Sequence, residues 1–311
     1  MSSPKNAYFQ GKIVPYSQAR VGVLTHALNY GTAAFAGIRA YWNDDQQELF
    51  IFRPVDHLRR LINASKMLLM KFEHTPESLT QIIIDLLCAD GNRCDVYIRP
   101  LVFKADEGIG VKLHDMRDEL AIAAFPYERY LVNDANAHVT ISSWRRVDDN
   151  MIPARGKISG AYANSALIKS DAVNAGFDEA LVLTQDGHIS EASAMNVFML
   201  RDGALITPPI TENILEGITR NTVIDLARKE LGLTVIERSI DRTEVFICDE
   251  LFLAGTAAQI TVVTRVDYRP VGSGLMGPVA ARLRGLYDDL VRGRLAQYRH
   301  WNVPVYGPNS R

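Results

Sequence analysis

Short runs rich in apolar, aromatic and β-branched side chains occur near the start of the chain, and such runs predict β-strands. Residues 12–15, 37–42 and 48–52 form such runs. The last two runs flank the polar residues 43–45, which are typical of a hairpin turn. We therefore expect the N-terminal part of the chain to begin with β-structure.

Helical spacing of apolar side chains follows these strands. Pro54 stands where helix starts favour proline, and apolar residues then recur every three or four positions to about residue 71. The residues that define this stripe are Val55, Leu58, Leu61, Ile62, Leu68 and Leu69. A second helix is predicted over residues 76–89.

The rest of the chain mixes strands and helices in partly segregated blocks. Asp-Gly pairs at 186–187 and 202–203 lie between apolar runs and predict hairpins. This order favours an α+β fold over a strict βαβ alternation. Weak periodicity at 126–137 predicts a connection between an N-terminal domain (1–125) and a C-terminal domain (138–311). Strands are expected at 95–104, 120–125, 138–143, 234–237, 250–253 and 260–266, and helices at 161–176, 218–231 and 278–297.

Length, charge and cysteine content exclude several classes of protein. The 311 residues suffice for about two domains of ordinary size. With 34 basic and 36 acidic residues the net charge is −2, which provides no electrostatic footprint for nucleic acid or an acidic membrane. The chain has no long apolar stretch and no signal sequence, so we expect no membrane segment and a cytoplasmic location. The 3 cysteines form no CxxC pair, which argues against a disulfide framework or a zinc site.

Common cofactor and hydrolase motifs are absent from the sequence. Gly108-Ile109-Gly110 lacks the third glycine of a dinucleotide-binding turn, and the segment 156–158 lacks the flanking residues of a P-loop. The histidines form no HExxH pair, and no GxSxG motif occurs. We therefore expect no metal centre, and these motifs alone indicate only a two-domain, enzyme-like protein.

Several segments in collinear order resemble the class IV (fold type IV) pyridoxal-phosphate aminotransferases, and among them the branched-chain amino-acid aminotransferases. The resemblance covers about residues 7–266. The segments are 24–39, Tyr97-Ile-Arg99-Pro-Leu, Gly156-Lys157-Ile-Ser-Gly160 with Tyr162 and Asn164, Ser190-Glu191-Ala-Ser, Gly217-Ile218-Thr219-Arg220 and Gly255-Thr256-Ala257-Ala258. The resemblance implies an α+β fold with a small N-terminal α/β domain and a larger C-terminal α/β domain whose sheet is barrel-like. It also implies pyridoxal 5'-phosphate as the cofactor.

The resemblance implies a catalytic role for Lys157 and supporting roles for Glu191 and Tyr162. Lys157 matches the lysine that forms a Schiff base with the cofactor and then carries a proton as general base and acid. Glu191 matches the carboxylate that keeps the pyridine nitrogen protonated, and Tyr162 matches the residue that binds the ring hydroxyl. Taken without their flanking motifs, these residues would be interpreted as a surface cation, an exposed acid beside a turn and a half-buried aromatic.

The same resemblance implies a phosphate site. Gly217, Ile218 and Thr219 begin a predicted helix, whose free N–H groups favour an anion, although Thr219 alone fits a helix cap equally well. Thr256 matches a further phosphate-binding residue. Arg60 matches the phosphate-binding arginine of the family, but periodicity places it nearly opposite the apolar stripe of its helix, on the side of Ala64 and Met67.

Substrate recognition requires an apolar pocket and groups that bind carboxylates. By resemblance, apolar walls come from Tyr30, Phe35, Gly37 and Tyr97. Arg99 resembles the residue that binds a substrate carboxylate, whereas alone it fits a surface ion pair at a strand end. By resemblance, Arg39 and the 255–258 turn, with Thr256 and Ala257, complete the substrate-binding set.

The activity implied is that of a branched-chain-amino-acid transaminase, which exchanges the amino group between L-leucine, L-isoleucine or L-valine and 2-oxoglutarate. Ala36 stands where relatives commonly have glutamate, which leaves Arg39 without that charge partner and puts the substrate range in question. The alternatives are a D-amino-acid or (R)-amine transaminase, an aminodeoxychorismate lyase and, more remotely, a non-catalytic scaffold. The trio Lys157, Glu191 and Tyr162 argues against the scaffold. The family also implies a homodimer or larger homo-oligomer, in which residues 105–116 complete the partner's pocket.

Overall fold

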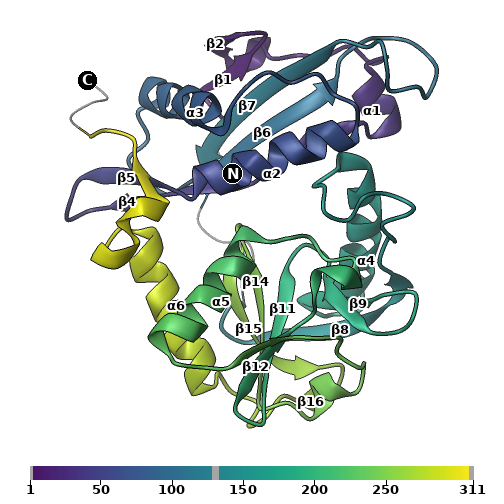
Figure 1. Cartoon of the computed structure of the whole chain (residues 1–311), viewed down its shortest axis with the longest axis vertical. Helices are drawn as coiled ribbons and strands as arrows, with labels where there is room; N and C mark the ends of the chain where they lie inside the picture. The colour runs from purple at the N-terminus through teal and green to yellow at the C-terminus, as the bar shows by residue number, and fades with distance from the viewer. Residues whose placement is uncertain (1–2, 128–132, 308–311) are drawn as a thin grey trace. The chain divides into compact units, whose positions relative to one another are not determined.

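The computed structural model describes residues 3–127 and 133–307 of the chain. They form two compact units, coloured along the chain in Figure 1. The first unit comprises Met1–Glu128, Gly156–Gly160 and Asp289–Arg311, and the second comprises Arg129–Arg155 and Ala161–Asp288. The expected connection at 126–137 lies partly outside the described residues, and the domain boundaries stay a prediction.

An antiparallel sheet forms the centre of the first unit. Its strands run in the order β17-β5-β4-β6-β7-β1-β2, with β3 added beside β6. Two helices, α2 (Pro54–Met67) and α3 (Pro76–Asp90), pack on each other and on strands of this sheet (Figure 1). The strands are β1 (Asn6–Phe9), β2 (Lys12–Pro15), β3 (Ala33–Phe35), β4 (Ile38–Asn43), β5 (Glu48–Phe52), β6 (Val96–Lys104), β7 (Asp118–Pro126) and β17 (Asn302–Pro304).

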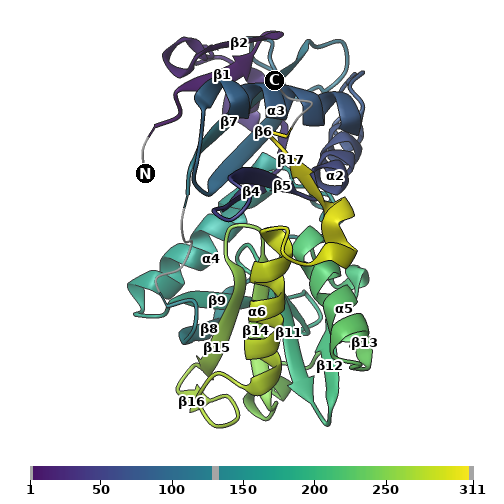
Figure 2. The ribbon, with the colours of Figure 1, turned by 90° about the vertical axis from the view of Figure 1, so that its left-hand side faces the viewer.

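A mixed sheet forms the centre of the second unit. Its order is β10-β9-β8-β15-β14-β11-β12-β13, with β16 (Arg269–Pro270) beside β15. The helices α4 (Tyr162–Asn174) and α5 (Ile218–Glu230) pack against β8 and β9 and against β13 and β14, respectively (Figure 2). The remaining strands are β8 (Ala137–Arg145), β9 (Glu179–Leu183), β10 (Ile189–Ala192), β11 (Asn196–Arg201), β12 (Ala204–Thr207), β13 (Val235–Glu237), β14 (Glu250–Gly255) and β15 (Gln259–Val266).

Both predicted Asp-Gly hairpins are present. Asp202 and Gly203 have φ values of 52° and 74°, and they connect β11 to β12 where Arg201 pairs with Ala204. Positive φ at both central residues gives the turn a twist that matches the strands, which is why this dipeptide favours hairpins. Gly187, with φ of 94°, lies in the turn between β9 and β10.

Most predicted helices are also confirmed, and local chemistry explains their ends. Thr75 and Ser78 cap the start of α3 reciprocally, and Gly91 ends this helix in the left-handed conformation. The buried Glu250 carboxylate accepts hydrogen bonds from the first N–H groups of α6 (Pro278–Val291), at Val279 (3.0 Å) and Ala280 (2.8 Å).

Two helices end several residues earlier than predicted. The helix expected over 54–71 stops at Met67, because Leu69 adopts a positive φ of 52°. The helix expected over 278–297 stops at Val291, where Gly293 turns the chain with φ of 71°, and a 3-10 helix, η5 (Ala296–Trp301), follows. Both helices were predicted too long because apolar residues continue at helical spacing beyond the residue where the helix ends. None of the helices in the described residues is long and apolar enough to cross a bilayer.

Candidate active site

Lys157 lies in a short segment that the first unit holds against β3. The Lys157 carbonyl oxygen accepts a hydrogen bond from the Phe35 N–H at 2.9 Å, and Ile158 forms a β-bridge with Ala34. Gly31 and Gly160 make the close approach possible. A Cβ on Gly31 would lie 2.7 Å from the Gly160 Cα, and the φ of Gly31 is +68°.

The charges of the half-buried Lys157 side chain and of Arg60 both lower the pKa of a buried histidine of α2. His57 is 1% exposed, and burial lowers the pKa of its imidazole well below the ordinary value, with smaller contributions from the charges of Arg60, Lys157 and Arg53. Arg60 therefore shares one side of α2 with the buried residues His57 and Ala64, and that side is packed. The periodicity objection to Arg60 thus disappears, while its contact with a phosphate stays a prediction.

The predicted substrate side of the first unit is drawn together around Phe35. The Arg99 guanidinium lies 4.5 Å from the centre of the Phe35 ring and donates to the Tyr97 hydroxyl at 2.9 Å, while the Lys157 Nζ lies 5.3 Å from the same ring centre. Gly37 must be small here, because a Cβ on it would lie 2.1 Å from the Tyr97 hydroxyl oxygen. Arg99 is thus exposed, and its guanidinium has the aromatic partners Phe35 and Tyr97.

Tyr30 contacts a different part of the first unit. It ends the short helix α1 (His26–Tyr30), and its hydroxyl accepts a hydrogen bond from the Gly110 N–H at 3.1 Å. Gly110 belongs to the long connection between β6 and β7, as expected for residues 105–116. Tyr30 therefore supports this loop, and its contact with substrate stays a prediction.

In the second unit, Glu191 is buried and surrounded by donors. It is 3% exposed, and the Arg146 Nη2 lies 2.8 Å from its Oε1. Its Oε2 accepts from the Asn196 side-chain amide at 3.0 Å and from the Leu215 N–H at 3.2 Å. The alternative interpretation of Glu191 as an exposed acid is therefore wrong, since the β-bulge of β10 against β9 occurs at this residue and its side chain points into polar partners.

The start of α5 offers backbone donors. Gly217 is the N-cap residue and has no side chain to satisfy the first N–H groups of the helix. Thr219 is buried and lies inside the helix, so its interpretation as the cap residue is wrong. Its hydroxyl and the helix start remain chemically suited to an anion.

The turn with Thr256 and Ala257 joins β14 to β15, where Gly255 pairs with Gln259. This turn lies near the residues around Glu191, because a Cβ on Gly255 would lie 3.0 Å from the Met195 Cγ. The structure therefore brings Glu191, the start of α5 and this turn to one region of the second unit. Tyr162 lies at the first position of α4 and is half-buried, and its role stays a prediction.

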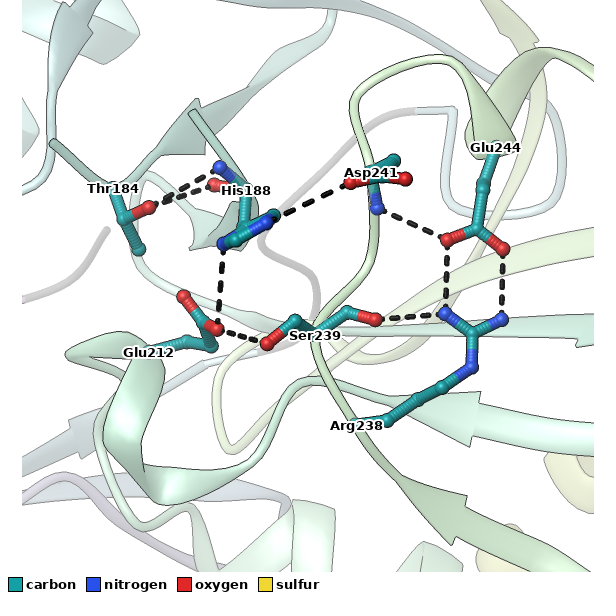
Figure 3. A network of polar contacts seen from close by, with 7 residues as sticks. All are labelled: Thr184, His188, Glu212, Arg238, Ser239, Asp241 and Glu244. Atoms are coloured by element: carbon teal, nitrogen blue, oxygen red, sulfur yellow. Dashed lines mark hydrogen bonds and ion pairs between the residues drawn. The ribbon is translucent and has the colours of Figure 1, made fainter. Parts of the chain in front are cut away.

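A polar network supports the segment that leads into α5 (Figure 3). The Ser190 hydroxyl donates to the Glu212 carbonyl oxygen at 2.6 Å, which connects β10 to this segment. The Glu212 carboxylate contacts the Ser239 hydroxyl and lies 3.7 Å from the His188 ring. The neighbouring Asn213 carbonyl accepts from the Arg146 Nε at 3.2 Å, so the segment and the Glu191 carboxylate share a partner.

Residues 34–266 match the Amino-transferase class IV family. The chain belongs to this family. It is 44% identical over 300 residues to a probable branched-chain-amino-acid aminotransferase of Aquifex aeolicus, covering 96% of each chain. Among solved structures it is similar to the branched-chain aminotransferase of Thermoproteus uzoniensis with norvaline (TM-score 0.93, 37% identity, 97% and 100% covered). It is also similar to that of Thermobaculum terrenum in its PLP form (TM-score 0.93, 40% identity, 98% and 99% covered).

These similarities confirm the predicted family and the two-domain α+β, fold type IV architecture of this aminotransferase. The predicted enzyme class is confirmed with them, because the relatives are branched-chain-amino-acid aminotransferases over nearly the full chain. The roles of the individual site residues rest on the resemblance and stay predictions.

The structure corrects the expectation that Arg39 lacks a charge partner in this aminotransferase. Arg39 is 2% exposed, lies 3.5 Å from the Asp95 carboxylate, donates to the Tyr127 carbonyl at 2.9 Å and stacks over Tyr41 at 4.8 Å. Asp95 precedes β6, which pairs with β4, and this pairing supplies the carboxylate that Ala36 does not. Contact between Arg39 and substrate stays a prediction.

Sequence reasoning missed an aromatic group beside the substrate side of this aminotransferase. The Tyr97 ring packs on Phe125 and Tyr127, with centres 5.6 and 5.4 Å apart. Burial raises the pKa of the Tyr127 phenol. Phe125 was expected only as a strand residue, and Tyr127 fell in the predicted connection, where no periodicity marked it.

Proposed function

We propose that this class IV aminotransferase transfers the amino group between the branched-chain L-amino acids leucine, isoleucine and valine and 2-oxoglutarate, with pyridoxal phosphate as cofactor. One observation carries the proposal: Lys157 and Arg99 lie at 5.3 and 4.5 Å from the same Phe35 ring. An amine, a carboxylate-binding cation and an apolar ring are the groups that a branched amino acid requires. Relatives that are 44% and 38% identical to the chain are named as branched-chain-amino-acid aminotransferases, which agrees with this substrate class.

The residues present fit pyridoxal phosphate. The second unit contains a buried carboxylate held by three donors, Glu191, and a helix start with no side-chain cap at Gly217. A phosphate and a protonated ring nitrogen require such groups. Within this proposal the cofactor is held by Arg60, Lys157, Tyr162, Glu191, Gly217, Ile218, Thr219 and Thr256.

Bound pyridoxal phosphate supplies a carbonyl that accepts the amino group and a ring that withdraws electrons from the substrate α-carbon. Lys157 removes the proton from that carbon and returns a proton in the reverse half-reaction. The Glu191 carboxylate keeps a proton on the ring nitrogen. The α5 N–H groups bind the phosphate, and Arg99 binds a substrate carboxylate. Phe35 and Tyr97 exclude water from the reacting carbon.

We propose that a second copy of the chain covers an apolar surface of the first unit. Val23, Leu28 and Ile109 are 80%, 63% and 93% exposed. The loop that carries Ile109 is tied to this surface, because the Gly108 N–H donates to the Leu24 carbonyl at 3.2 Å. Large exposed apolar patches mark interaction sites. In the resulting homodimer, residues 105–116 would complete the partner's pocket.

Light scattering after size-exclusion chromatography tests the homodimer. We expect a mass of two chains, and Ile109→Asp should shift it toward one chain, because an acid would be buried in the interface. Ile236→Asp, at an exposed position of the second unit (39%), is the control that should keep the dimer mass. A single-chain mass for the unaltered protein would contradict the proposal.

We also propose a cytoplasmic location and soluble amino acids and 2-oxo acids as the partners. Cys88, Cys94 and Cys248 are free thiols, which suits a reducing compartment. Cell fractionation tests the location.

A panel of amino donors tests the substrate class. With 2-oxoglutarate as acceptor, L-leucine, L-isoleucine and L-valine should each give glutamate, at rates that exceed those with D-alanine or an (R)-amine. A preference for the D-amino acid or the (R)-amine would reassign the substrate within the family. Formation of pyruvate from aminodeoxychorismate would indicate the lyase.

A further inference from the structure

Asn196 lies between two of the groups that the proposed function assigns to the cofactor, the Glu191 carboxylate and the start of α5. It is 5% exposed and stands at the first position of β11. Its side-chain Nδ2 donates to the Glu191 Oε2 and to the Leu215 carbonyl oxygen, both at 3.0 Å. One amide nitrogen therefore joins the buried acid to the segment that leads into α5.

The acceptor atom of the same side chain faces the N-cap residue of α5. A Cβ built on Gly217 would lie 2.1 Å from the Asn196 Oδ1 and 3.2 Å from the Arg220 Cβ. The φ of Gly217 is −71°, which any residue adopts, so backbone strain does not explain the glycine. The Asn196 side chain explains why glycine stands at position 217, because a methyl group there would require this side chain to move.

We propose that Asn196 is a positioning residue that fixes the distance between the Glu191 carboxylate and the start of α5. This inference rests on the proposed function, in which Glu191 meets the ring nitrogen of the cofactor and the start of α5 meets its phosphate. The ring and the phosphate belong to one rigid molecule. Both ends bind well only if the two protein groups are correctly spaced, and this single side chain contacts both.

The two donor bonds and the glycine contact also predict how substitutions behave. Asn196→Ala removes both donors and frees the space beside Gly217. Asn196→Asp keeps the shape, removes the donors and places a second negative charge beside Glu191. Gly217→Ala leaves Asn196 chemically intact but displaces it. If spacing is the function of Asn196, Gly217→Ala and Asn196→Ala must act through the same contact and must not be additive.

The test is a double-mutant cycle on the dissociation constant of pyridoxal phosphate, measured by titrating cofactor-free protein. We expect Asn196→Ala, Asn196→Asp and Gly217→Ala each to weaken binding by about tenfold or more, since each breaks hydrogen bonds to a charged group or moves them. In the Asn196→Ala background, Gly217→Ala should add less than about threefold. The proposal would be overturned if Gly217→Ala weakened cofactor binding by the same factor with and without Asn196→Ala. It would also be overturned if the Asn196→Asp variant bound the cofactor as tightly as the unaltered protein.

A second readout separates positioning from general stability. The pH midpoint of the bound cofactor's absorbance should shift by about half a unit or more in Asn196→Ala, because the field of Glu191 at the ring changes. A variant that only folds less stably would keep this midpoint, and an unchanged midpoint would overturn the proposal. Asn174→Ala, at an exposed position of α4, is the control that should match the unaltered protein in both measurements.

Different results would contradict the proposed function and the role of Asn196. If the unaltered protein does not bind pyridoxal phosphate, the proposed function is wrong and the positioning role is overturned with it. If the unaltered protein binds the cofactor and transaminates leucine but the cycle is additive, only the role of Asn196 is wrong.

Discussion

Arg146 and Glu191 form a buried ion pair in the second unit, with 2.8 Å between Nη2 and Oε1 and side chains that are 10% and 4% exposed. Removal of one partner from such a pair leaves an uncompensated buried charge, which costs more than the pair contributes. Arg146 therefore both orients Glu191 and makes its burial tolerable.

Arg146→Leu should lower the free energy of unfolding by about 3 kcal/mol, because the Glu191 carboxylate loses its cation inside the protein. Urea denaturation at pH 7 measures this. Arg155→Leu is the matched control, since the Arg155 side chain is 41% exposed and its ion pairs are worth less than about 1 kcal/mol. An equal decrease in the free energy of unfolding of the two variants would show that the buried Arg146–Glu191 pair stabilises the protein no more than an exposed pair does.

Lys157→Ala should abolish leucine transamination, by about a thousandfold or more, while the fold persists. The amine moves the proton at the substrate α-carbon, whereas the hydrogen bond that the Lys157 carbonyl oxygen accepts from the Phe35 N–H does not depend on the side chain. Steady-state rates and thermal melting measure the two effects. Lys229→Ala, at a side chain that is 59% exposed, should change neither. Undiminished turnover in Lys157→Ala would remove this lysine from the mechanism.

Glu191→Gln should bind cofactor yet slow the removal of the α-proton, because a neutral amide does not hold a proton on the ring nitrogen. Single-turnover kinetics with ordinary and α-deuterated leucine measure that step. We expect a slower rate and a larger isotope effect than in the unaltered enzyme. Identical rates and isotope effects in the two proteins would assign Glu191 a purely structural role.

Glu244 is paired with Arg238 in the second unit (Figure 3), and we expect this pairing to make the stability of the unit depend on pH. Hydrogen bonds from Arg238 at 2.8 and 2.7 Å are the main cause that lowers the pKa of the Glu244 carboxyl from 4.5 to about 2, and Arg201 adds a bond at 2.6 Å. Because the folded-state pKa is depressed, the stabilisation is fully present above the unfolded-state pKa. It is lost as the pH falls from about 4.5 toward 2.

Glu244→Gln should therefore lower the free energy of unfolding at pH 7 by about 1–2 kcal/mol and reduce its loss between pH 5 and 3. Urea denaturation across this range measures both. Asp202→Asn serves as the control, because the Asp202 side chain is 91% exposed and its turn tolerates asparagine. A Glu244→Gln variant with the pH profile of the unaltered protein would contradict the assignment.

The parts of the fold that local chemistry determines could be predicted from the sequence. The Asp202-Gly203 hairpin and the helix that begins at Pro76 depend on turn and cap residues within a few positions of each other. Three of the shortest segments were not predicted, because none of them is long enough to show a period. The helix His26–Tyr30 has five residues, and β3 and β17 have three each, so tertiary pairing determines them.

Some residues of the candidate site could likewise be predicted from the sequence, and others could not. Lys157, Glu191 and Gly217 stand in motifs and could be found by resemblance. Arg146 and Asn196 could not, because their contacts with Glu191 arise when β8, β10 and β11 take their places in one sheet. For Arg39 the sequence was misleading. Ala36, which stands where relatives commonly have glutamate, suggested that Arg39 lacks a charge partner, but Asp95, which is distant in the sequence, is that partner.

An absorbance spectrum of the protein with pyridoxal phosphate, recorded before and after the addition of L-leucine alone, tests the central claim most directly. We predict a yellow band that leucine bleaches and that 2-oxoglutarate restores, because the two half-reactions use the same Lys157 and cofactor. A yellow band that leucine leaves unchanged would contradict the substrate assignment, and the absence of any band would contradict the assignment of the cofactor.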